Sequence, residues 1–510
     1  MIYMSQETTH RTRRIAKNTM MLYIRMLFMM FLGLFTSRIV LEALGENDFG
    51  IYNVVGGVVA MFSLISGSLT TAVTRFITFE MGRGESAQLN KVYSNAVVIQ
   101  LILAVIIAII AEPIGLWFID NKMTIDPSRI PAARMVLHFS ILAFMVNLMS
   151  VPQMASITAH EKMSAYAYIG ILEGVLKFAV ALAIAHSASD RLILYAILMA
   201  VSVVIVRVVY SIYCRSNFPE CRYRPGFDKG LFKEMFSFAG WNFIGIAASV
   251  IRDYGGTILI NLFYGPAVNA ARAIALQLNN AVQSFVKNFM TAVNPQITKL
   301  YAAGDTASML SLVTKSSKIS YYLLLILIMP IIFNVDFLLG IWLKEVPEYS
   351  HIFVVLFLIF SLSECLANPM VTATLATGKI KINYIIGVLV MLNLPVSYIC
   401  LKAGAAPESI LVVAIVLSQI CLIARFLILK SLVNFPSRDF LVKVYLNVIA
   451  VTAISVILPY MTYVFTNNDF TGFIIRSVVC VISVGLTVLY VGLNGNERKE
   501  LRNFISLRKK

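Results

Sequence analysis

The sequence has little charge, few histidines and no long polar segment. Only 13% of its 510 residues are charged, whereas soluble proteins carry about 25%. Hydrophobic residues make up 59% of the chain, and the mean hydropathy is +0.81. The longest internal polar segments, 121–134 and 215–233, are too short to bury a core of their own. These shortages exclude a hidden soluble domain and predict a polytopic helical membrane protein.

The sequence also lacks a catalytic or metal-binding constellation. It contains no HExxH, P-loop, nucleophile elbow or GxGxxG motif ahead of a helix. The six cysteines are scattered and mostly lie in or next to apolar runs, which favours packing over metal or redox work. We therefore expect no catalytic residue, no metal and no cofactor. Any driving force for a transport cycle is expected from a proton or sodium gradient or from substrate supply.

Apolar runs long enough to cross a bilayer recur along the whole chain. They predict an all-α fold of about fourteen transmembrane helices. The second and eighth predicted spans are the most polar. The predicted spans are 18–43, 49–80, 88–112, 132–159, 163–186, 191–215, 233–262, 266–300, 307–334, 350–377, 380–402, 408–432, 439–465 and 470–493.

Charge alternates between the connections of these spans. Lys and Arg gather at both termini and in every second loop, and acidic residues gather in the loops between. Because cytoplasmic loops carry the basic excess, this pattern predicts that both termini lie in the cytoplasm. The net charge of +16 is then explained by topology and attraction to anionic lipids, so no nucleic acid is expected as a partner.

The chain resembles itself after a shift of 220 residues. The segment Thr71–Ser86 falls on Thr291–Thr306, and Gly45 falls on Gly265 in the turn between two spans. Six spans separate the two copies. Because six is an even number, both copies cross the membrane in the same direction, as in transporters that are built from parallel repeats. The predicted organisation is an N-lobe at 1–215, a linker at 216–232, a C-lobe at 233–432, and two further spans with a basic tail at 433–510.

The stretch "TSRIVLEALGENDFGIYNVV" (Thr36–Val55) adds a family resemblance through Arg38, Leu44-Gly45, Phe49-Gly50 and Tyr52. It is similar to the polysaccharide, O-antigen type branch of the multidrug/oligosaccharidyl-lipid/polysaccharide exporter superfamily. The resemblance implies a V-shaped pair of six-helix lobes around a central cleft. It implies a flippase in a bacterial inner membrane that moves undecaprenyl-diphosphate-linked oligosaccharides to the periplasmic leaflet by alternating access. Expected partners are this substrate, membrane lipids and polysaccharide polymerase machinery.

Basic residues outnumber acidic ones inside the predicted spans. An ionisable side chain in a span usually faces protein or a water-filled cavity, and Arg and Lys suit the oxygens of a diphosphate. The sequence therefore predicts a cationic cleft for an anionic substrate. Its candidate substrate-binding residues are Arg25, Arg38, Arg207, Arg252, Arg272 and Lys287. Three others are candidates for ion coupling or charge balance, namely Asp253, Glu173 and Lys177.

Several of these residues also have a structural interpretation. Glu173 and Lys177 are four apart in the favoured order for a helical pair. Arg252 and Asp253 point about 100° apart on a helix, so we expect them not to satisfy each other. Arg252 would meet the diphosphate, and Asp253 would hold Arg272, Lys287 or a coupling ion. A buried interhelical ion pair is the alternative. The glycines at 255 and 256 would loosen the helix or allow close approach.

Three other functions remain open. An ion-coupled multidrug or cation antiporter of the same fold would need acidic side chains in its N-lobe cavity to attract cations. Glu173 is the one mid-span acid of the predicted N-lobe. A lipid II-type flippase would share the cationic cleft. A membrane-embedded glycan polymerase or ligase would place a large loop outside, and the longest outer loop, 113–131, is short.

Overall fold

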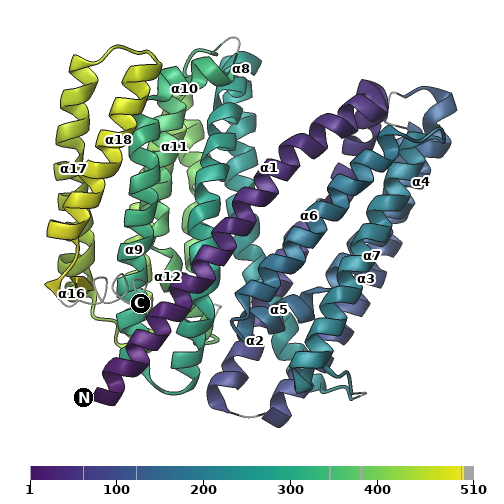
Figure 1. Ribbon diagram of the computed structural model, residues 1–510, viewed down its shortest axis with the longest axis horizontal. Coiled ribbons are helices and arrows are strands. Elements are labelled where there is room, and N and C mark those ends of the chain that lie inside the picture. Colours follow the sequence, from purple (N-terminus) through teal and green to yellow (C-terminus); the bar gives the residue numbers. More distant parts are fainter. Residues whose placement is uncertain are drawn as a thin grey trace. The chain divides into compact units, whose positions relative to one another are not determined.

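The protein is α-helical throughout the part of the chain that the computed structural model describes (Figure 1). The described residues are 2–60, 62–84, 86–121, 123, 125–224, 226–343, 346–379, 383–495 and 497–498. Within them, twelve helical segments are long and apolar enough to cross a membrane, and they correspond to twelve of the fourteen predicted spans. The second and eighth predicted spans are helical where described, but their polar residues keep them outside that criterion.

Contacts within the chain define two compact units. The N unit is Lys17–Phe243, and the C unit comprises Met1–Ala16 with Ile244–Lys510. Both unit boundaries fall inside long helices, α1 (Ile2–Ala60) and α8 (Lys229–Ala302). The lobe limits predicted from the sequence stay predictions, and most of the basic tail, 499–510, lies outside the described residues.

The helices of the N unit follow one another through short connections. Asp190 starts one of them by accepting hydrogen bonds from the backbone N–H groups of Leu192 and Ile193, the capping role that aspartate fills well. After the α1 segment come α2 (Ser63–Arg83), α3 (Ser86–Asn121), η1 (Pro127–Arg129), α4 (Ile130–Met149), α5 (Val151–Ala159), α6 (Met163–Ala185), α7 (Arg191–Asn217) and η2 (Pro219–Cys221).

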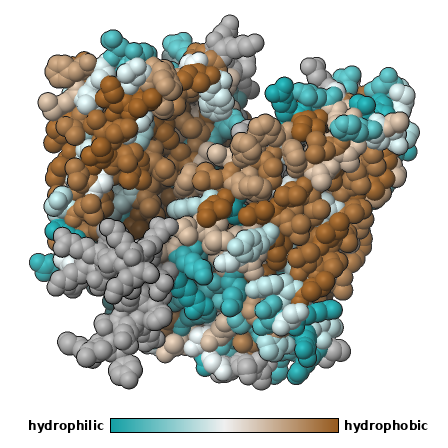
Figure 2. All heavy atoms as spheres, viewed as in Figure 1, coloured by the Kyte–Doolittle hydropathy of each residue, from teal (hydrophilic) through white to brown (hydrophobic). Residues whose placement is uncertain are grey.

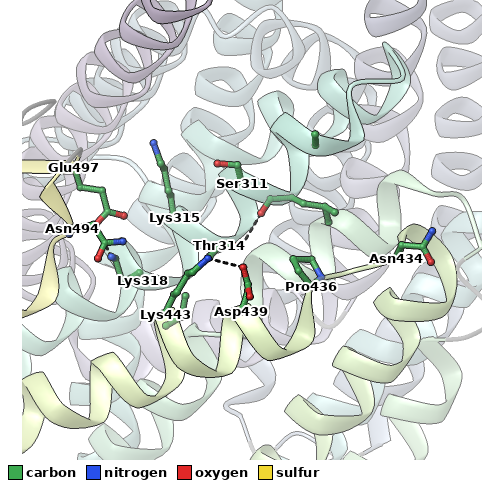
Figure 3. A pocket seen from close by; sticks show the side chains of 13 residues that line it. Ser311, Thr314, Lys315, Lys318, Asn434, Pro436, Asp439, Lys443, Asn494 and Glu497 are labelled. Carbon is green, nitrogen blue, oxygen red and sulfur yellow. Dashed lines mark hydrogen bonds and ion pairs between the residues drawn. The ribbon is translucent and has the colours of Figure 1, made fainter.

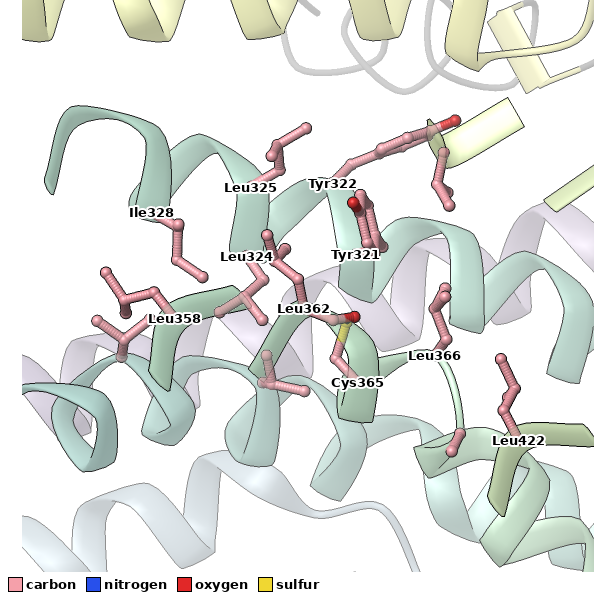
Figure 4. Close-up of a cluster of buried hydrophobic side chains, with 14 of the residues drawn as sticks. Tyr321, Tyr322, Leu324, Leu325, Ile328, Leu358, Leu362, Cys365, Leu366 and Leu422 are labelled. Atoms are coloured by element: carbon pink, nitrogen blue, oxygen red, sulfur yellow. The ribbon is translucent and has the colours of Figure 1, made fainter. Parts of the chain in front are cut away.

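The C unit packs its helices around one large apolar core (Figure 4). Leu324, Leu325 and Ile328 of α9 meet Leu358 and Leu362 of the next long helix in this core. After α8 come α9 (Thr306–Ile332), α10 (Val335–Trp342), α11 (Ser350–Cys365), α12 (Asn368–Ala376), α13 (Asn383–Met391), α14 (Asn393–Lys402), α15 (Ser409–Val433), α16 (Ser437–Phe440), η4 (Leu441–Tyr445), α17 (Leu446–Phe465), α18 (Phe470–Thr487) and η5 (Val488–Gly492).

The 220-residue repeat is present in the backbone. Gly45 interrupts α1 with φ 74° and ψ 168°, and Gly265 interrupts α8 with φ 79° and ψ −175°. This region of backbone space is essentially restricted to glycine. Gly84 and Gly304 end the following helices with φ 77° and 78°. Over 71–84 and 291–304, burial matches residue for residue. The internal repeat predicted from sequence is therefore confirmed.

A broken span provides further support for the repeat. The fourth predicted span consists of α4 and α5, and the tenth consists of α11 and α12. Both second halves are nine residues long and carry a proline in their first turn, Pro152 and Pro369. Proline is accepted there because the first helical N–H groups have no partner within the helix. The two units thus share irregularities as well as helix order.

The outer surface of the last two spans is apolar. Figure 2 shows hydrophobic side chains covering the middle of α17 and α18, with hydrophilic residues toward their ends. The exposed side chains include Ile449, Ile457, Met461, Ile474, Val478, Val481 and Leu486. A patch of this kind suits contact with lipid tails, as expected of a multi-pass membrane protein.

Candidate functional site

In the N unit, two glycines allow α1 to lie against α6. Gly170 and Gly174 are four residues apart, so they share one helical face. A Cβ atom at Gly170 would lie 2.1 Å from Nε of Arg25, and one at Gly174 would lie 2.5 Å from Sδ of Met29. This is the small-xxx-small arrangement that lets membrane helices approach closely. This spacing is visible in the sequence, and it is a signal for a close helix contact that hydropathy and charge do not carry.

Arg25 lies on this interface rather than at a helix end. Its guanidinium carbon is 4.5 Å from the centre of the Tyr166 ring of α6, within range for a cation–π contact. Its Nε is buried and has no hydrogen-bond partner among the described residues. The structure thus places the predicted residue at depth in the N unit, with donor capacity left over.

Next to this interface the N unit contains a pocket of about 260 Å³. It is formed by the α1 helix on both sides of the Gly45 turn, by α6 and by α7. One charged side chain, Lys177, lines it together with hydroxyl groups, aromatic rings and apolar side chains. The lining residues are Met29, Leu32, Gly33, Thr36, Ser37, Val40, Phe49, Tyr52, Gly174, Lys177 and Tyr195.

Lys177 is held by Glu173 one turn earlier on α6. Its Nζ lies 2.6 Å from Oε1 of Glu173, and each side chain keeps about a third of its surface exposed (35% and 33%). The predicted helical pair is therefore formed. The rings of Tyr52 and Tyr195 also line this pocket, and their centroids are 4.6 Å apart. A lysine with only one described acidic partner, beside ring faces and hydroxyls, can bind a phosphate oxygen or a sugar hydroxyl.

Two further predicted residues of the N unit lie elsewhere. Arg38 is exposed and pairs with Glu42 one turn later on α1, with Nε 2.9 Å from Oε1. Such exposed pairs contribute little energy. Arg207 of α7 is half-buried near Tyr93 and Cys214, and its Nη1 has no hydrogen-bond partner among the described residues. Neither residue lines the Lys177 pocket.

In the C unit, Arg252 and Asp253 pair with each other. Nε of Arg252 lies 3.0 Å from Oδ1 of Asp253, and the guanidinium is stacked over the ring of Phe360 at 4.8 Å. The expectation that these neighbours would not satisfy each other is wrong. The Cα–Cβ bonds do diverge by about 100°, but the long arginine side chain spans that divergence.

Arg272 is held inside the C unit through both of its terminal nitrogens, while its buried Nε has no hydrogen-bond partner among the described residues. It is 3% exposed, and it donates from Nη1 to the Thr257 hydroxyl (2.6 Å) and from Nη2 to the Asp253 carbonyl (3.0 Å). A Cβ atom on Gly256 would lie 2.9 Å from Nη2. The glycine therefore allows close approach, one of the two roles predicted for it. Asp253 thus binds Arg272 by a hydrogen bond to its backbone carbonyl, and its carboxylate interacts with Arg272 electrostatically.

A second acid and a third base complete this cluster. Glu364 of α11 interacts electrostatically with Arg252 and with Arg425 of α15. A chain of hydrogen bonds also links α11, α15 and η4 through Ser363, Ser418, Gln419 and Tyr445. The sequence showed Glu364 and Arg425 as ionisable groups in spans, but it gave no sign that they share one site.

Lys287 lies at the exposed surface of α8 and lines none of the pockets described here. Asn279 and Gln283 form a polar stripe on α8 with Lys287, at four-residue spacing. Gln283 donates to the Ser361 hydroxyl at 2.8 Å and so ties α8 to α11. Asn279 accepts from the same hydroxyl. This part of the stripe is interhelical, whereas Lys287 remains available to a ligand or to solvent.

A family model described as "Polysaccharide biosynthesis protein" matches residues 15–301, more than half of the chain. The chain belongs to this family. Its match to the uncharacterized membrane protein EpsK of Bacillus subtilis (strain 168) has 19% identity over 301 residues. That alignment spans 58% of the chain and 59% of the relative's own length.

Solved transporters of the MOP superfamily share the fold. A MOP superfamily transporter from Pyrococcus furiosus aligns with a TM-score of 0.68 at 11% identity, covering 81% of this chain and 94% of that one. The MATE transporter VcmN of Vibrio cholerae, solved as a mutant, aligns with a TM-score of 0.68 at 15% identity, covering 84% and 98%. The predicted superfamily and all-α transporter fold are confirmed.

Proposed function

We propose that the protein flips undecaprenyl-diphosphate-linked oligosaccharide repeat units from the cytoplasmic to the periplasmic leaflet of a bacterial inner membrane by alternating access. Both termini would lie in the cytoplasm. Membership of the polysaccharide biosynthesis family supports a glycan-related substrate, and the MOP fold supports a transporter rather than an enzyme. Partners would be the lipid-linked substrate, membrane lipids and polysaccharide polymerase machinery.

The Lys177 pocket is the observation that carries this proposal. A lysine inside a span is costly unless it faces protein or water, and this one lines a pocket with two tyrosine rings. Ring faces suit the apolar faces of sugars, and the hydroxyls of Thr36 and Ser37 suit their polar edges. A charge, hydroxyls and rings in one pocket match a phosphate-linked sugar better than a hydrophobic cation.

We revise the predicted cationic cleft accordingly. Arg252 and Arg272 are occupied within the C unit, so we assign them to the architecture of that unit. Arg25 and Lys177 of the N unit, with the exposed Lys287 of the C unit, are the residues we propose to meet the anionic substrate. Asp253 is proposed as the residue that couples transport to protons or sodium, because its carboxylate keeps 37% of its surface exposed beside the Arg252 pair.

An ion-coupled antiporter for drugs or cations is the second candidate. The likeness to solved MATE transporters and the acids Asp253 and Glu364 of the C unit favour it. In the N unit, however, Glu173 is neutralised by Lys177. The pocket therefore lacks a negative charge available to a cation, which makes this the weaker candidate.

The test is complementation of a chromosomal deletion. We expect the deletion to abolish surface polysaccharide and to accumulate undecaprenyl-diphosphate-linked repeat units. Lys177→Gln should restore little export, whereas Lys162→Gln, an exposed lysine at the start of the same helix, should restore it fully at equal protein level. Glu173→Gln keeps the lysine and should retain export.

Each other outcome identifies a different function. Normal polysaccharide with raised drug sensitivity would favour the antiporter. Loss of viability with accumulated peptidoglycan precursor would favour a lipid II-type flippase. Full export by Lys177→Gln would remove the pocket from the substrate path.

A further inference from the structure

The bend of α1 at Gly45 is tied down on both sides by arginines. Two residues before the bend, the backbone carbonyl of Ala43 accepts a hydrogen bond from Nη1 of Arg191 at 3.0 Å. Three residues after it, Oδ1 of Asp48 accepts from Nε of Arg129 at 2.9 Å, and Nη2 of the same arginine contacts Oδ2. Our assignment of the substrate path uses none of these residues.

Arg129 joins this bend to the start of α7. Its Nη1 lies 2.7 Å from Oδ2 of Asp190, and its Nη2 lies 3.3 Å from Oδ1. Asp190 is itself fixed, because it accepts hydrogen bonds from the first backbone N–H groups of α7. Arg191, the next residue, holds the other side of the bend. The start of α7 is therefore the common anchor for both sides of the bend.

Both ties lie one helical turn from the aromatic part of the Lys177 pocket. Tyr52 comes four residues after Asp48, so the two share one face of α1. In the same way, Tyr195 comes four residues after Arg191 on α7. The two tyrosine rings meet at 4.6 Å and line the pocket. This ring contact thus depends on the same two helices that the arginines hold together.

The segment after the bend needs such a tie. Helical hydrogen bonds do not carry the direction of α1 across Gly45, because its φ of 74° and ψ of 168° lie outside the helical region. The direction of 46–60 is then set by side-chain contacts. Arg129 supplies a charged one that is partly buried, with 28% of its side chain exposed against 20% for Asp48. A forked, partly buried pair is stronger than an exposed one.

Lysines of the C unit show how a single point charge differs from this fork. The C unit contains a pocket of about 500 Å³, in which Lys443 reaches Asp439 one turn away (Figure 3). Lys318 pairs with Glu497 in the same pocket. Each of these lysines holds one carboxylate, whereas Arg129 holds two that come from different helices.

We propose that Arg129 is a positioning residue of the Lys177 pocket. It holds the segment 46–60, which presents Tyr52, against α7, which presents Tyr195. Loss of the fork lets this wall of the pocket move, while Lys177 keeps its place on α6. The position of the wall is a property of the N unit alone, and only the ligand used to probe it rests on the proposed function.

The first experiment measures hydrogen exchange in the purified full-length protein. Arg129→Gln should raise amide exchange in 46–56 about tenfold, which corresponds to about 1.4 kcal/mol of local stability. Exchange in α6 should stay unchanged. Arg129→Lys keeps the charge without the fork, so it should raise exchange by less. Asp48→Asn removes one charge at constant shape and should raise exchange in the same segment, which keeps the test decisive if Arg129→Gln does not fold.

The matched control is Arg134→Gln. Arg134 lies near the start of α4 and pairs with Asp120 of α3 at 2.9 Å, and it does not line the Lys177 pocket. Its exchange in 46–56 should equal that of the wild type. An equal rise with Arg134→Gln, or a rise spread over every helix of the N unit, would show a general loss of stability and overturn the positioning role. Unchanged exchange in both Arg129→Gln and Asp48→Asn would do the same.

The second experiment connects the wall to the ligand. Undecaprenyl-diphosphate-linked N-acetylglucosamine is titrated into the same proteins in detergent, and bound lipid is counted by native mass spectrometry. Arg129→Gln should bind it about tenfold more weakly than the wild type, and Arg134→Gln should bind it equally well. Equal binding by Arg129→Gln would overturn its role in the pocket. Failure of the wild type to bind would reject the proposed substrate, and the exchange comparison would still decide whether Arg129 positions the wall.

Discussion

The pair Lys318–Glu497 allows a sharp test of how the last described residues are anchored. Lys318 is 3% exposed and Glu497 16% exposed, with Nζ 2.6 Å from Oε2. Glu497 also accepts the backbone N–H of Asn494 at 2.7 Å. At an effective dielectric constant of about 20, two charges at this distance attract by about 6 kcal/mol. Desolvation of both ions offsets much of this attraction in the intact pair.

When one partner is removed, the desolvation cost of the other ion is no longer offset by their attraction. Glu497→Ala leaves a buried ammonium without its carboxylate, and such losses cost about 3–5 kcal/mol. We expect the lower end, about 3 kcal/mol, because Glu497 keeps some contact with solvent. The double variant Lys318→Met with Glu497→Ala removes both charges and should cost less than Glu497→Ala alone.

The assay is thermal and denaturant unfolding of the purified protein for the wild type, both single variants and the double variant. The double-mutant cycle should give a coupling of about 2 kcal/mol or more. A coupling near zero, or a loss below about 1 kcal/mol for Glu497→Ala, would refute the assignment of a buried ion pair. Hydrogen exchange should place the loss around Lys318 in the middle of α9 and after η5.

Three further results are expected. Gly265→Ala and Gly45→Ala should each lower stability by about 1–3 kcal/mol, because their backbone conformation excludes side chains. Gly245→Ala, in a helix with open space, should be neutral or stabilising in the same melts. Thr257→Val should cost about 1–3 kcal/mol by leaving buried Arg272 short of an acceptor, whereas Thr257→Ser should restore the wild-type melting temperature. The hydrogen bond from Arg129, with help from two backbone N–H groups, holds the pKa of Asp190 below its usual range despite partial burial. That stabilisation is present above about pH 4 and is lost as the pH falls through the lowered value. Asp190→Asn keeps the helix cap but loses the charge. Its melting temperature should therefore be lower than that of the wild type at pH 7, and the two should become equal below the lowered pKa of Asp190.

The span pattern and the repeat could be predicted because each rests on local composition. Length and hydropathy indicate a span without knowledge of its neighbours, which is why the twelve apolar ones were found. Glycine at 45 and 265 marked the turns because few other residues adopt that backbone conformation. The breaks at Pro152 and Pro369 are equally local, although each of the two predicted spans was continuous across its proline.

The site was harder to predict, because it depends on which helix faces which. The Glu173–Lys177 pair was found since both partners lie on one helix. The pocket beside it joins α1, α6 and α7, and nothing in the composition of α6 tells that Tyr195 of α7 lines the same pocket as Lys177. Gly170 and Gly174 are the residues from which the contact between α6 and α1 could have been predicted, because small residues four apart indicate a close helix contact.

Arg252 and Asp253 show the limit of reasoning from helix geometry alone. The direction of the Cα–Cβ bond predicts which partners a short side chain can reach. It does not do so for arginine, because the guanidinium lies several bonds from the backbone. Arg252 meets its neighbour on the same helix and still interacts with Glu364 on another. Once it and Arg272 are held inside the C unit, an excess of basic residues in the spans no longer measures a cationic pathway. The count has to be restricted to bases that line a pocket, and for the described N-unit pocket of α1, α6 and α7 that restriction selects Lys177.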